Sequence, residues 1–290
     1  MRLKKYTIIG GDLRSIKLAN LLASEGNNVN IYGFKKTGFE LGIKESEDVG
    51  VAINGSEIIV GPLPCSNDDE TINAPFHTEE IYINDILRKM SKNQLFIAGR
   101  ISSKISHIAE VYNVYSVDMF KREELAILNA IPTAEGAIQI AMEEMPITLH
   151  SSNSLILGFG RIGKTLAKML YGIGANVFVE ARKYSDIAWI SSYGYKAIHF
   201  NDLGSNLKEM DIIFNTIPYV VLDTEMLKKI NTECLVIDLA SKPGGVDFEK
   251  AKELRIKVIW ALSLPGKVAP VTAAKVIKET IYNIIEELGV

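Results

Sequence analysis

Apolar runs of three to five residues alternate along the first half of the chain with segments whose apolar residues recur at helical spacing. These runs predict strands at 6–9, 29–32, 57–60, 94–98 and 114–117. The segments between them predict helices at 13–25, 79–90 and 102–111. Strands that alternate with helices are typical of a parallel α/β sheet. A polar stretch at 62–75 follows a strand and is expected to form a loop at the carboxyl edge of this sheet.

The second half repeats this pattern more regularly. Its predicted strands are 154–157, 177–180, 197–199, 212–215, 235–238 and 258–260. Six strands separated by helical segments match the strand number of a full doubly wound sheet. Each half also begins with an apolar strand, a glycine turn and a helix. The chain is therefore predicted to be an α/β protein with two Rossmann-like, doubly wound parallel-sheet domains.

Two further helices are expected to join these domains. Pro132 suits the first turn of a helix, which predicts a helix over 133–145. Pro270 begins another, which runs through about residue 288 with one apolar face. The predicted organisation is an N-terminal substrate or partner domain at 1–130, an interdomain helix at 131–150, a nucleotide-binding domain at 151–268 and a C-terminal helix at 269–290. We expect that last helix to pack back on the first domain, with a hinged cleft between two lobes.

Composition narrows the class of partner. The 290 residues are enough for two domains, and a hydrophobic content of 47% supports sizeable cores. A formal net charge of −3 gives no case for a nucleic-acid partner. Cys65 and Cys234 fit no metal or redox spacing, so they are expected to be reduced core residues. With no signal peptide or transmembrane run, we expect a soluble cytoplasmic protein without a membrane partner.

The apolar run at 155–157 ends in Gly158-x-Gly160-x-x-Gly163 and leads into a helical pattern. This is the arrangement of a dinucleotide-binding fingerprint. The first glycine permits a tight turn, the second lets the backbone approach a pyrophosphate, and the third lets the helix pack close to the strand. Free N–H groups at the start of the helix attract the phosphates. The predicted cofactor contacts here are Gly158, Phe159, Gly160, Arg161, Ile162 and Gly163.

The following strand bears on which dinucleotide binds. It ends at Glu180, and Arg182 and Lys183 come just after it. An acidic residue at this place takes the ribose 2′-hydroxyl of NAD, whereas an arginine accommodates the 2′-phosphate of NADP. Two cations favour the phosphate, and a planar guanidinium can also stack on adenine. We therefore expect NADP, with NAD bound through Glu180 as the alternative.

Other strand ends supply further candidates. Four more cofactor contacts are predicted after the fourth strand of the second domain: Asn215, Thr216, Ile217 and Pro218. The loops after the fifth and sixth strands carry Lys242 and Lys267, which are candidate anchors for a substrate carboxylate. Arg14 and Arg100 are further candidates in the first domain, and the helix start at Thr133 could add backbone N–H groups. Together these cations make an anionic substrate plausible.

Two features are given structural interpretations. The Gly10-Gly11 turn of the first domain lacks the remaining glycines of a fingerprint, so it is interpreted as a Rossmann-like relative rather than a second cofactor site. None of the four histidines has a partner at catalytic or metal spacing: His77, His107, His150 and His199. Acid–base chemistry by histidine and a metal site are therefore not predicted.

The second half resembles the cofactor domain of the D-2-hydroxyacid dehydrogenases. That family carries an Arg-Gly motif after the fifth strand and a Pro-His motif after the sixth. The corresponding stretches here are Ser241-Lys242-Pro243-Gly244 and Leu264-Pro265-Gly266. The family's catalytic arginine and histidine are both missing, which argues against oxidation of a hydroxyl group by a histidine base.

A resemblance over essentially the whole chain is to the family of dipicolinate synthase A-subunits. It rests on IIGGDLR at 8–14, NAIPTAEG at 129–136, LGFGRIGKT at 157–165, NTIP at 215–218, DLASKPGGVDF at 238–248 and LPGKVAPVTA at 264–273. The resemblance implies an NADP-dependent dehydrogenase of spore-forming bacteria. It would form dipicolinate, pyridine-2,6-dicarboxylate, from the cyclic dihydrodipicolinate-pathway intermediate during sporulation, alongside the flavoprotein-like B-subunit of dipicolinate synthase.

Two alternatives stay open. One is an NADP-dependent 2-hydroxyacid or 2-oxoacid reductase, and the other is a non-catalytic NADP-binding protein that serves its partner. The catalytic residues, and whether the chain forms a homo-oligomer, are also left open.

Overall fold

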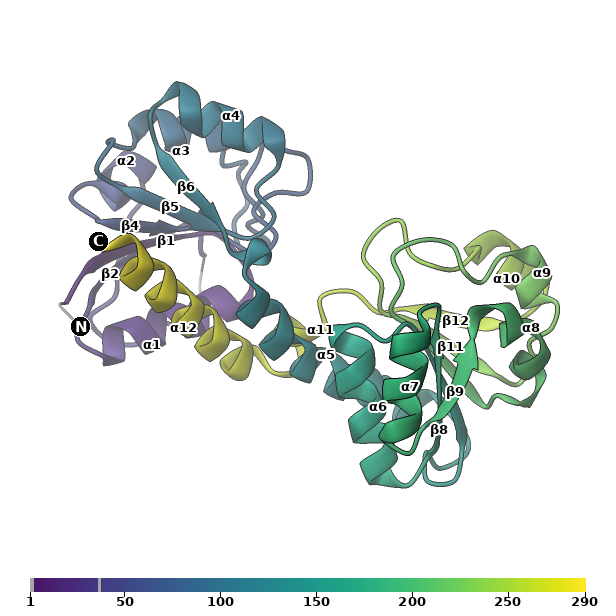
Figure 1. Ribbon diagram of the computed structural model, residues 1–290. Coiled ribbons are helices and arrows are strands. Elements are labelled where there is room, and N and C mark those ends of the chain that lie inside the picture. The colour runs from purple at the N-terminus through teal and green to yellow at the C-terminus, as the bar shows by residue number, and fades with distance from the viewer. Residues whose placement is uncertain (1–2, 36–37) are drawn as a thin grey trace. The chain divides into compact units, whose positions relative to one another are not determined.

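The structure is a computed structural model that describes residues 3–35 and 38–290. The chain forms two compact units (Figure 1). Unit 1 comprises Met1–Leu128 and Ala269–Val290, and unit 2 comprises Asn129–Val268. Each unit is built around one six-stranded sheet.

The sheet of unit 1 has the order β3-β2-β1-β4-β5-β6, and neighbouring strands are parallel. Its strands are β1 (Lys5–Ile9), β2 (Asn28–Tyr32), β3 (Lys44–Glu45), β4 (Ile58–Val60), β5 (Leu95–Ala98) and β6 (Tyr115–Asp118). The helices are α1 (Leu13–Ser24), α2 (Val49–Ile53), α3 (Ile83–Lys89), α4 (Ser103–Val111), the 3₁₀ helix η1 (Met119–Lys121) and α12 (Pro270–Leu288).

The sheet of unit 2 has the order β12-β11-β10-β7-β8-β9, again parallel throughout. Its strands are β7 (Asn153–Leu157), β8 (Asn176–Ala181), β9 (Lys196–His199), β10 (Ile212–Asn215), β11 (Leu235–Asp238) and β12 (Lys257–Trp260). The helices are α6 (Arg161–Ile173), α7 (Tyr184–Ser192), α8 (Leu203–Asn206), α9 (Thr224–Leu227), α10 (Phe248–Glu253) and α11 (Leu264–Val268), with 3₁₀ helices η2 (Phe200–Asp202) and η3 (Leu207–Glu209).

Both sheets therefore have the same strand order when each is counted from its own first strand, which is the doubly wound order of dinucleotide-binding domains. Each sheet is also buried on both faces. In β7, for example, Ile156 belongs to the core on one face, whereas Leu155 and Leu157 belong to the core on the other. Such strands form continuous apolar runs in the sequence, which is why the sequence reveals them. The predicted fold class is confirmed.

One helix, α5 (Glu123–Glu144), begins in unit 1 and continues into unit 2, since the division falls after Leu128. The prediction that this helix begins at Thr133 is wrong, because Pro132 lies inside it. A proline in a helix removes the backbone hydrogen bond to the residue four places earlier, here Leu128. Buried residues on both sides of the proline compensate for that loss: Leu125, Ala130, Ala134, Ala137 and Ala141.

α5 is also the one helix among the described residues that is long and apolar enough to cross a membrane. Of its most apolar window, 44% is buried within the protein. Ala134, Ala137 and Ala141 belong to the core of unit 2. Packing inside unit 2 therefore accounts for part of the apolar character of α5.

The predicted helix at 79–90 also needs correction, because α3 begins only at Ile83. The residues before it are extended. The carbonyl of Ile81 accepts a hydrogen bond from the N–H of Ile72, and Tyr82 pairs with Thr71. Neither β3 nor α2 was predicted, since both are too short to give a clear period.

α12 packs within unit 1, where it lies against α1 (Figure 1). Ala274, Ile277 and Ile281 are spaced at helical intervals and are buried in the core of that unit. Lys278 forms an ion pair with Glu25, the C-cap of α1. The last segment of the chain is thus part of the first unit, although it follows the second in sequence.

Candidate nucleotide-binding site

The glycine turn of unit 2 connects β7 to α6. Gly158 has a φ of +92°, and a Cβ there would meet Ile217 and Thr216 at 2.9 Å. A Cβ on Gly163 would lie 2.1 Å from the Gly158 carbonyl oxygen, so only glycine allows this approach of helix to strand. Around Gly160, in contrast, nothing lies within 4 Å of the place that a Cβ would take. The turn therefore has the geometry that a pyrophosphate requires.

The N-terminus of α6 begins at this open position. Gly160 is its N-cap and offers no side-chain acceptor, and the first turn holds no acidic residue. Its first N–H groups and the positive end of its dipole can therefore attract an anion. Arg161 is exposed on this turn, whereas Phe159 is 8% exposed and Ile162 packs against the core.

The segment after β10 lies against the glycine turn. The Thr216 hydroxyl donates to the Leu157 carbonyl at 2.8 Å. Ile217 lies 2.9 Å from the place that a Cβ on Gly158 would take, and Pro218 is exposed. The structure thus brings together two stretches that the sequence predicts to contact the cofactor. They meet because β10 pairs with β7, which places the residues after each strand at the same edge of the sheet.

Beneath this segment, Asn215 and Asp238 form a buried polar pair at the ends of β10 and β11. They are register partners in the sheet, and both are 0% exposed. The Asn215 amide donates to the Asp238 carboxylate at 2.8 Å and to the Ile217 carbonyl at 3.0 Å. Asp238 also accepts from the N–H groups of Ala240 and Gly245, at 3.0 and 2.8 Å. The Asn215 side chain therefore shapes the loops from inside and does not reach the surface as a cofactor ligand.

Glu180 lies under the glycine turn. Its side chain is 1% exposed, and Oε2 accepts a hydrogen bond from the Gly158 N–H at 3.2 Å. Oε1 is buried and has no hydrogen-bond partner among the described residues. Burial raises the pKa of Glu180, against the opposing effects of the Gly158 N–H, Arg182 and His199. In this position the carboxylate supports the turn, and neither oxygen is presented at the surface.

Arg182 and Lys183 are exposed beyond the end of β8. The Arg182 Cζ lies 4.6 Å from the ring centroid of Tyr219 and 5.0 Å from that of Phe200, which are cation–π distances. Lys183 is the N-cap of α7 and makes no side-chain capping hydrogen bond. Two cations thus lie together at this strand end, and the first turn of α7 adds one acidic residue, Asp186.

The corresponding turn of unit 1, between β1 and α1, is covered by the chain itself. The Gly11 N–H donates to the Asn73 carbonyl at 2.9 Å, and a Cβ on Gly10 would meet Ile72 at 2.7 Å. At the N-cap, where α6 has a glycine, α1 has Asp12, whose carboxylate accepts from the N–H of Arg14. This turn is closed, in agreement with its structural interpretation.

Two of the predicted substrate anchors are occupied by internal contacts. Arg14 is 6% exposed, and its guanidinium donates to the Asp12 carboxylate and to the Leu63 carbonyl. Thr133 lies in the interior of α5, where its hydroxyl donates to the Asn129 carbonyl at 2.8 Å. The prediction of free N–H groups at Thr133 is therefore wrong, because the helix does not begin there.

The other three anchors, Arg100, Lys242 and Lys267, are exposed. Arg100 follows β5 in unit 1 with a φ of +56°, and its N–H donates to the Asp118 carboxylate at 2.8 Å. Lys242 lies in the loop after β11, and Lys267 lies in α11, both in unit 2. These three cations remain available for an anionic substrate.

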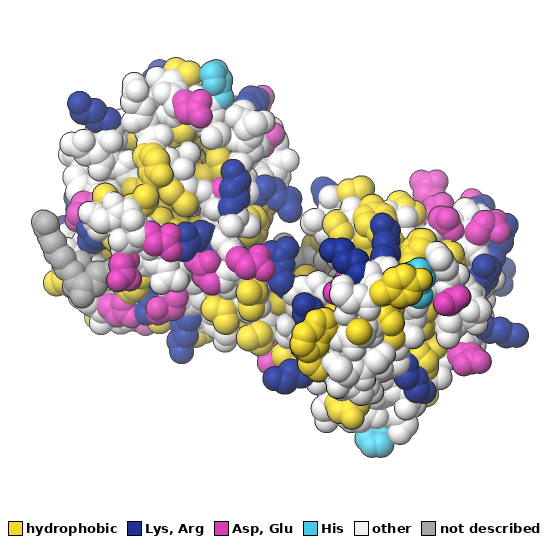
Figure 2. Space-filling view, in the orientation of Figure 1, with side chains coloured by type: hydrophobic (Ala, Val, Ile, Leu, Met, Phe, Trp, Pro, Cys, Tyr) yellow, Lys and Arg dark blue, Asp and Glu magenta, His cyan; other side chains and the backbone are white. Residues whose placement is uncertain are grey.

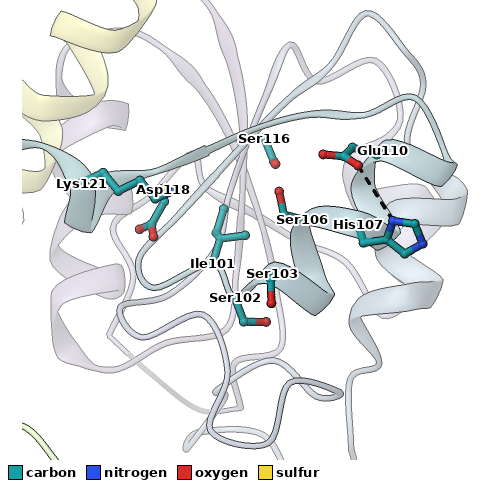
Figure 3. A pocket seen from close by; sticks show the side chains of 9 residues that line it. All are labelled: Ile101, Ser102, Ser103, Ser106, His107, Glu110, Ser116, Asp118 and Lys121. Carbon is teal, nitrogen blue, oxygen red and sulfur yellow. Dashed lines mark ion pairs between the residues drawn. The ribbon is translucent and has the colours of Figure 1, made fainter.

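A cavity of about 380 Å³ lies in unit 1 beside α4 and β6 (Figure 3). Its charged lining residues are Glu110, Asp118 and Lys121, and His107 Nδ1 lies 3.9 Å from a carboxylate oxygen of Glu110. Two carboxylates and one lysine give this lining no excess of positive charge. It therefore does not suit a dicarboxylate substrate.

No group of three or more His, Cys, Asp or Glu residues that could hold a metal ion occurs in residues 3–35 and 38–290. The His199 ring stacks on Tyr184 at a centroid distance of 5.2 Å, and His150 contacts the hydroxyl of Ser151. Cys65 and Cys234 are free and buried, and burial raises the pKa of each thiol to about 12. Both thiols therefore stay protonated near neutral pH.

Unit 2 also has an exposed aromatic surface. Figure 2 shows hydrophobic side chains over α6 and α7. Tyr171, Trp189 and Tyr193 are each more than half exposed there, at 54%, 56% and 51%. Trp189 and Tyr193 stack at a centroid distance of 5.6 Å.

The open glycine turn and the doubly wound sheet define unit 2 as a dinucleotide-binding domain of the dehydrogenase class. Residues 130–241 match the NAD-binding domain of the D-isomer specific 2-hydroxyacid dehydrogenases. Residues 5–120 match the N-terminal domain of the dipicolinate synthase A-subunit. These matches support a nicotinamide cofactor and an oxidoreductase function.

Whole-chain relatives make the assignment specific. The chain is 31% identical to the dipicolinate synthase A-subunit of Bacillus subtilis (strain 168), over 98% of this chain and 96% of that protein. A crystal structure of the A-subunit from Bacillus halodurans superposes with a TM-score of 0.90 at 30% identity and covers 97% of each chain. That of the Bacillus subtilis protein gives a TM-score of 0.88 at 30% identity, over 100% of this chain and 98% of that one. The chain belongs to the family of dipicolinate synthase A-subunits.

The sequence patterns did not indicate three residues of this site: Asp238, Phe200 and Tyr219. Asp238 could have been found from its position, because a polar residue that ends an apolar strand beside Asn215 in the next strand predicts a buried pair. The contacts of Phe200 and Tyr219 with Arg182 carry no such signal, since they join three different strand ends.

Proposed function

We propose that this protein oxidises the cyclic dihydrodipicolinate-pathway intermediate to dipicolinate, with NADP as the hydride acceptor. The observation that carries the proposal is the relationship to the dipicolinate synthase A-subunit, which spans both units and 98% of the chain. The open turn at Gly160 supports the dinucleotide part of it.

The proposed oxidation requires little acid–base catalysis from the protein. A bound nicotinamide supplies a ring carbon that accepts a hydride. Loss of a hydride and a proton from the dihydro ring gives an aromatic product, whose stability lowers the need for a strong base. This agrees with the stretch after β12, where Pro265 and Gly266 are buried in α11 and no histidine is present. The residues of the chain mainly bind and orient the two reactants.

The substrate carries two carboxylates, which cations on the protein would anchor. Arg100, Lys242 and Lys267 are the exposed candidates. A guanidinium can bind a carboxylate through two parallel hydrogen bonds, whereas a lysine acts as a point charge. Arg100→Ala and Lys242→Ala should each raise KM for the intermediate more than they change KM for the dinucleotide. Unchanged values of both would exclude these two residues.

The preference for NADP over NAD rests on the end of β8. Arg182 and Lys183 favour a 2′-phosphate, while Glu180 is buried beneath the turn. We expect Arg182→Ala to weaken NADP binding by about 10-fold to 100-fold, since a hydrogen bond to a charged group contributes about 1.5–3 kcal/mol. NAD binding should change by less than about two-fold.

Isothermal titration calorimetry with both dinucleotides checks this prediction. Lys168→Ala, which removes an exposed lysine of α6, is the matched control and should leave both affinities unchanged. A wild-type protein that binds NAD more tightly than NADP would contradict the proposed preference.

The activity itself needs a reconstituted assay. The full chain is incubated with freshly prepared intermediate and NADP, with and without a B-subunit protein, and both nicotinamide reduction and dipicolinate are measured. The proposal expects dipicolinate formation that depends on this chain and on NADP, in partnership with the B-subunit. Binding of NADPH without turnover, even when the B-subunit is present, would favour the non-catalytic alternative.

A second candidate function is reduction of a 2-oxoacid. The match of residues 130–241 to the 2-hydroxyacid dehydrogenase domain favours it. The stretches that correspond to that family's Arg-Gly and Pro-His motifs, Ser241-Lys242-Pro243-Gly244 and Leu264-Pro265-Gly266, contain neither an arginine nor a histidine, and this disfavours it. Turnover of glyoxylate or hydroxypyruvate with NADPH would support this candidate over the first.

A further inference from the structure

The contact of Arg182 with two aromatic rings has no counterpart in the glycine fingerprint. Arg182 follows β8, Phe200 follows β9, and Tyr219 follows β10, so three strand ends meet at this guanidinium. Tyr219 is 42% exposed, and Phe200 packs partly against the core of unit 2. Two aromatic side chains of the protein thus pack against Arg182, the arginine that we expect to bind a 2′-phosphate.

We propose that Tyr219 and Phe200 position Arg182 for the 2′-phosphate and thereby set the selectivity for NADP over NAD. This inference rests on the proposed NADP preference. Both residues are positioning residues, since they act through Arg182 and not by touching the reacting atoms.

The physical reason lies in the shape of the guanidinium. It binds an aromatic ring with its flat face and a phosphate with the N–H groups at its edge. The rings of Tyr219 and Phe200 lie 4.6 and 5.0 Å from the Arg182 Cζ, and a phosphate would bind the N–H groups at the edge of the guanidinium. Contacts that hold the side chain also reduce the rotamer entropy that a free arginine loses on binding. An arginine held in this way binds a phosphate more tightly than a free one.

Neighbouring groups fit the same ligand. Lys183, directly after Arg182, adds a second cation. Thr216 and Ile217 hold the segment that carries Tyr219 against the glycine turn, which fixes the backbone position of Tyr219. Tyr219 therefore lies in a segment that packs against the glycine turn, and its ring contacts Arg182, the residue proposed to select NADP.

The test uses 2′,5′-ADP and 5′-ADP as probes, with the full chain and isothermal titration calorimetry. Tyr219→Leu should weaken 2′,5′-ADP binding by about two-fold to five-fold, the effect of an exposed cation–π contact, and should leave 5′-ADP unchanged. Tyr219→Phe keeps the ring and should bind both probes as the wild type does. Tyr171→Leu, at an exposed tyrosine in the last turns of α6, is the matched control and should change neither.

A double-mutant cycle separates positioning from direct contact. In an Arg182→Ala background, Tyr219→Leu should have no further effect on 2′,5′-ADP, because the residue that it positions is gone. An equal loss of both probes, or an undiminished loss in that background, would overturn the proposal and indicate that Tyr219 touches the nucleotide itself. If the wild type does not distinguish the two probes, the NADP preference fails instead, and Tyr219 has nothing to select.

Discussion

The two sheets of this protein have the same strand order, and in each the first strand leads through a glycine turn into a helix. At Gly160 in unit 2 the turn is open, and α6 begins without a side-chain cap. In unit 1 the Gly11 N–H is hydrogen-bonded to the Asn73 carbonyl, and the side chain of Asp12 caps the start of α1. The same topology therefore carries one turn that can receive a phosphate and one that cannot.

The doubly wound strand order alone therefore does not make a nucleotide site. An N-cap aspartate accepts a hydrogen bond from an N–H group of the first turn and places a negative charge where a phosphate would bind. A loop that packs on the turn, here residues 72–74, then blocks the ligand sterically. In unit 1 both obstacles are present, whereas Gly160 has neither an acidic cap nor a covering atom within 4 Å of its Cβ position. Variants that exchange these features test the comparison directly.

The largest effect is expected from Gly11→Ala in the closed turn. Gly11 has a φ of +101°, and its Cβ would lie 2.9 Å from the Ser15 Cβ and 3.2 Å from Pro62. Strain and overpacking should together lower the free energy of unfolding by about 2–3 kcal/mol. Denaturant unfolding measures the loss, while NADPH affinity should stay at the wild-type value because unit 2 is untouched.

Gly172→Ala is the matched control for that variant. Nothing lies within 4 Å of its Cβ position in α6, so alanine should be neutral or stabilise by up to about 1 kcal/mol. A loss of NADPH binding in Gly11→Ala without a loss of stability would mean that the turn of unit 1 does contribute to a nucleotide site.

A smaller effect, now on binding, is expected from Gly160→Asp. This change gives α6 an aspartate N-cap, as Asp12 is for α1. Stability should be retained, since aspartate is a favourable N-cap, but NADPH binding should weaken by about ten-fold or more because the carboxylate repels the phosphates. Titration calorimetry and thermal unfolding of the same sample separate the two effects.

The reciprocal variant, Asp12→Gly, should not create a second site. The contacts of Gly10 and Gly11 with residues 72–74 would still cover the turn. A second molecule of NADPH bound by Asp12→Gly would show that the cap alone closes unit 1.

The smallest effect concerns pH and Glu180. Its folded pKa is raised above the ordinary value of 4.5 by burial, so its contribution to stability is greatest below pH 4.5 and is lost as the pH rises through the folded value. The melting temperature of Glu180→Gln, relative to wild type, should therefore increase as the pH rises from 4.5. Differential scanning calorimetry over a series of buffers measures this trend.

Glu25→Gln in unit 1 provides the opposite sign. Hydrogen bonds from Lys278 and Tyr282 lower the pKa of Glu25, so its contribution is present above pH 4.5 and is lost on acidification. The difference between this variant and wild type should shrink as the pH falls. The same trend in both variants would contradict the burial of Glu180 under the turn.

Local patterns made much of the fold predictable. Apolar runs such as 155–157 indicate strands buried on both faces. The spacing of Gly158, Gly160 and Gly163 indicates the turn, because all three glycines that it requires lie within six consecutive residues. The start of α5 was predicted wrongly because Pro132 is a common first residue of a helix, and only burial on both sides of it keeps the helix continuous.

The candidate site was less predictable, for a physical reason. The α/β class, the two sheets and the glycine turn could be predicted, because they depend on residues that are close along the chain. Three features appear only in the folded chain: Glu180 is buried, Arg14 is bound to Asp12 and Leu63, and Tyr219 contacts Arg182. Those contacts depend on which strand ends lie side by side, and strand order is set by the packing of the whole unit, which no local pattern contains.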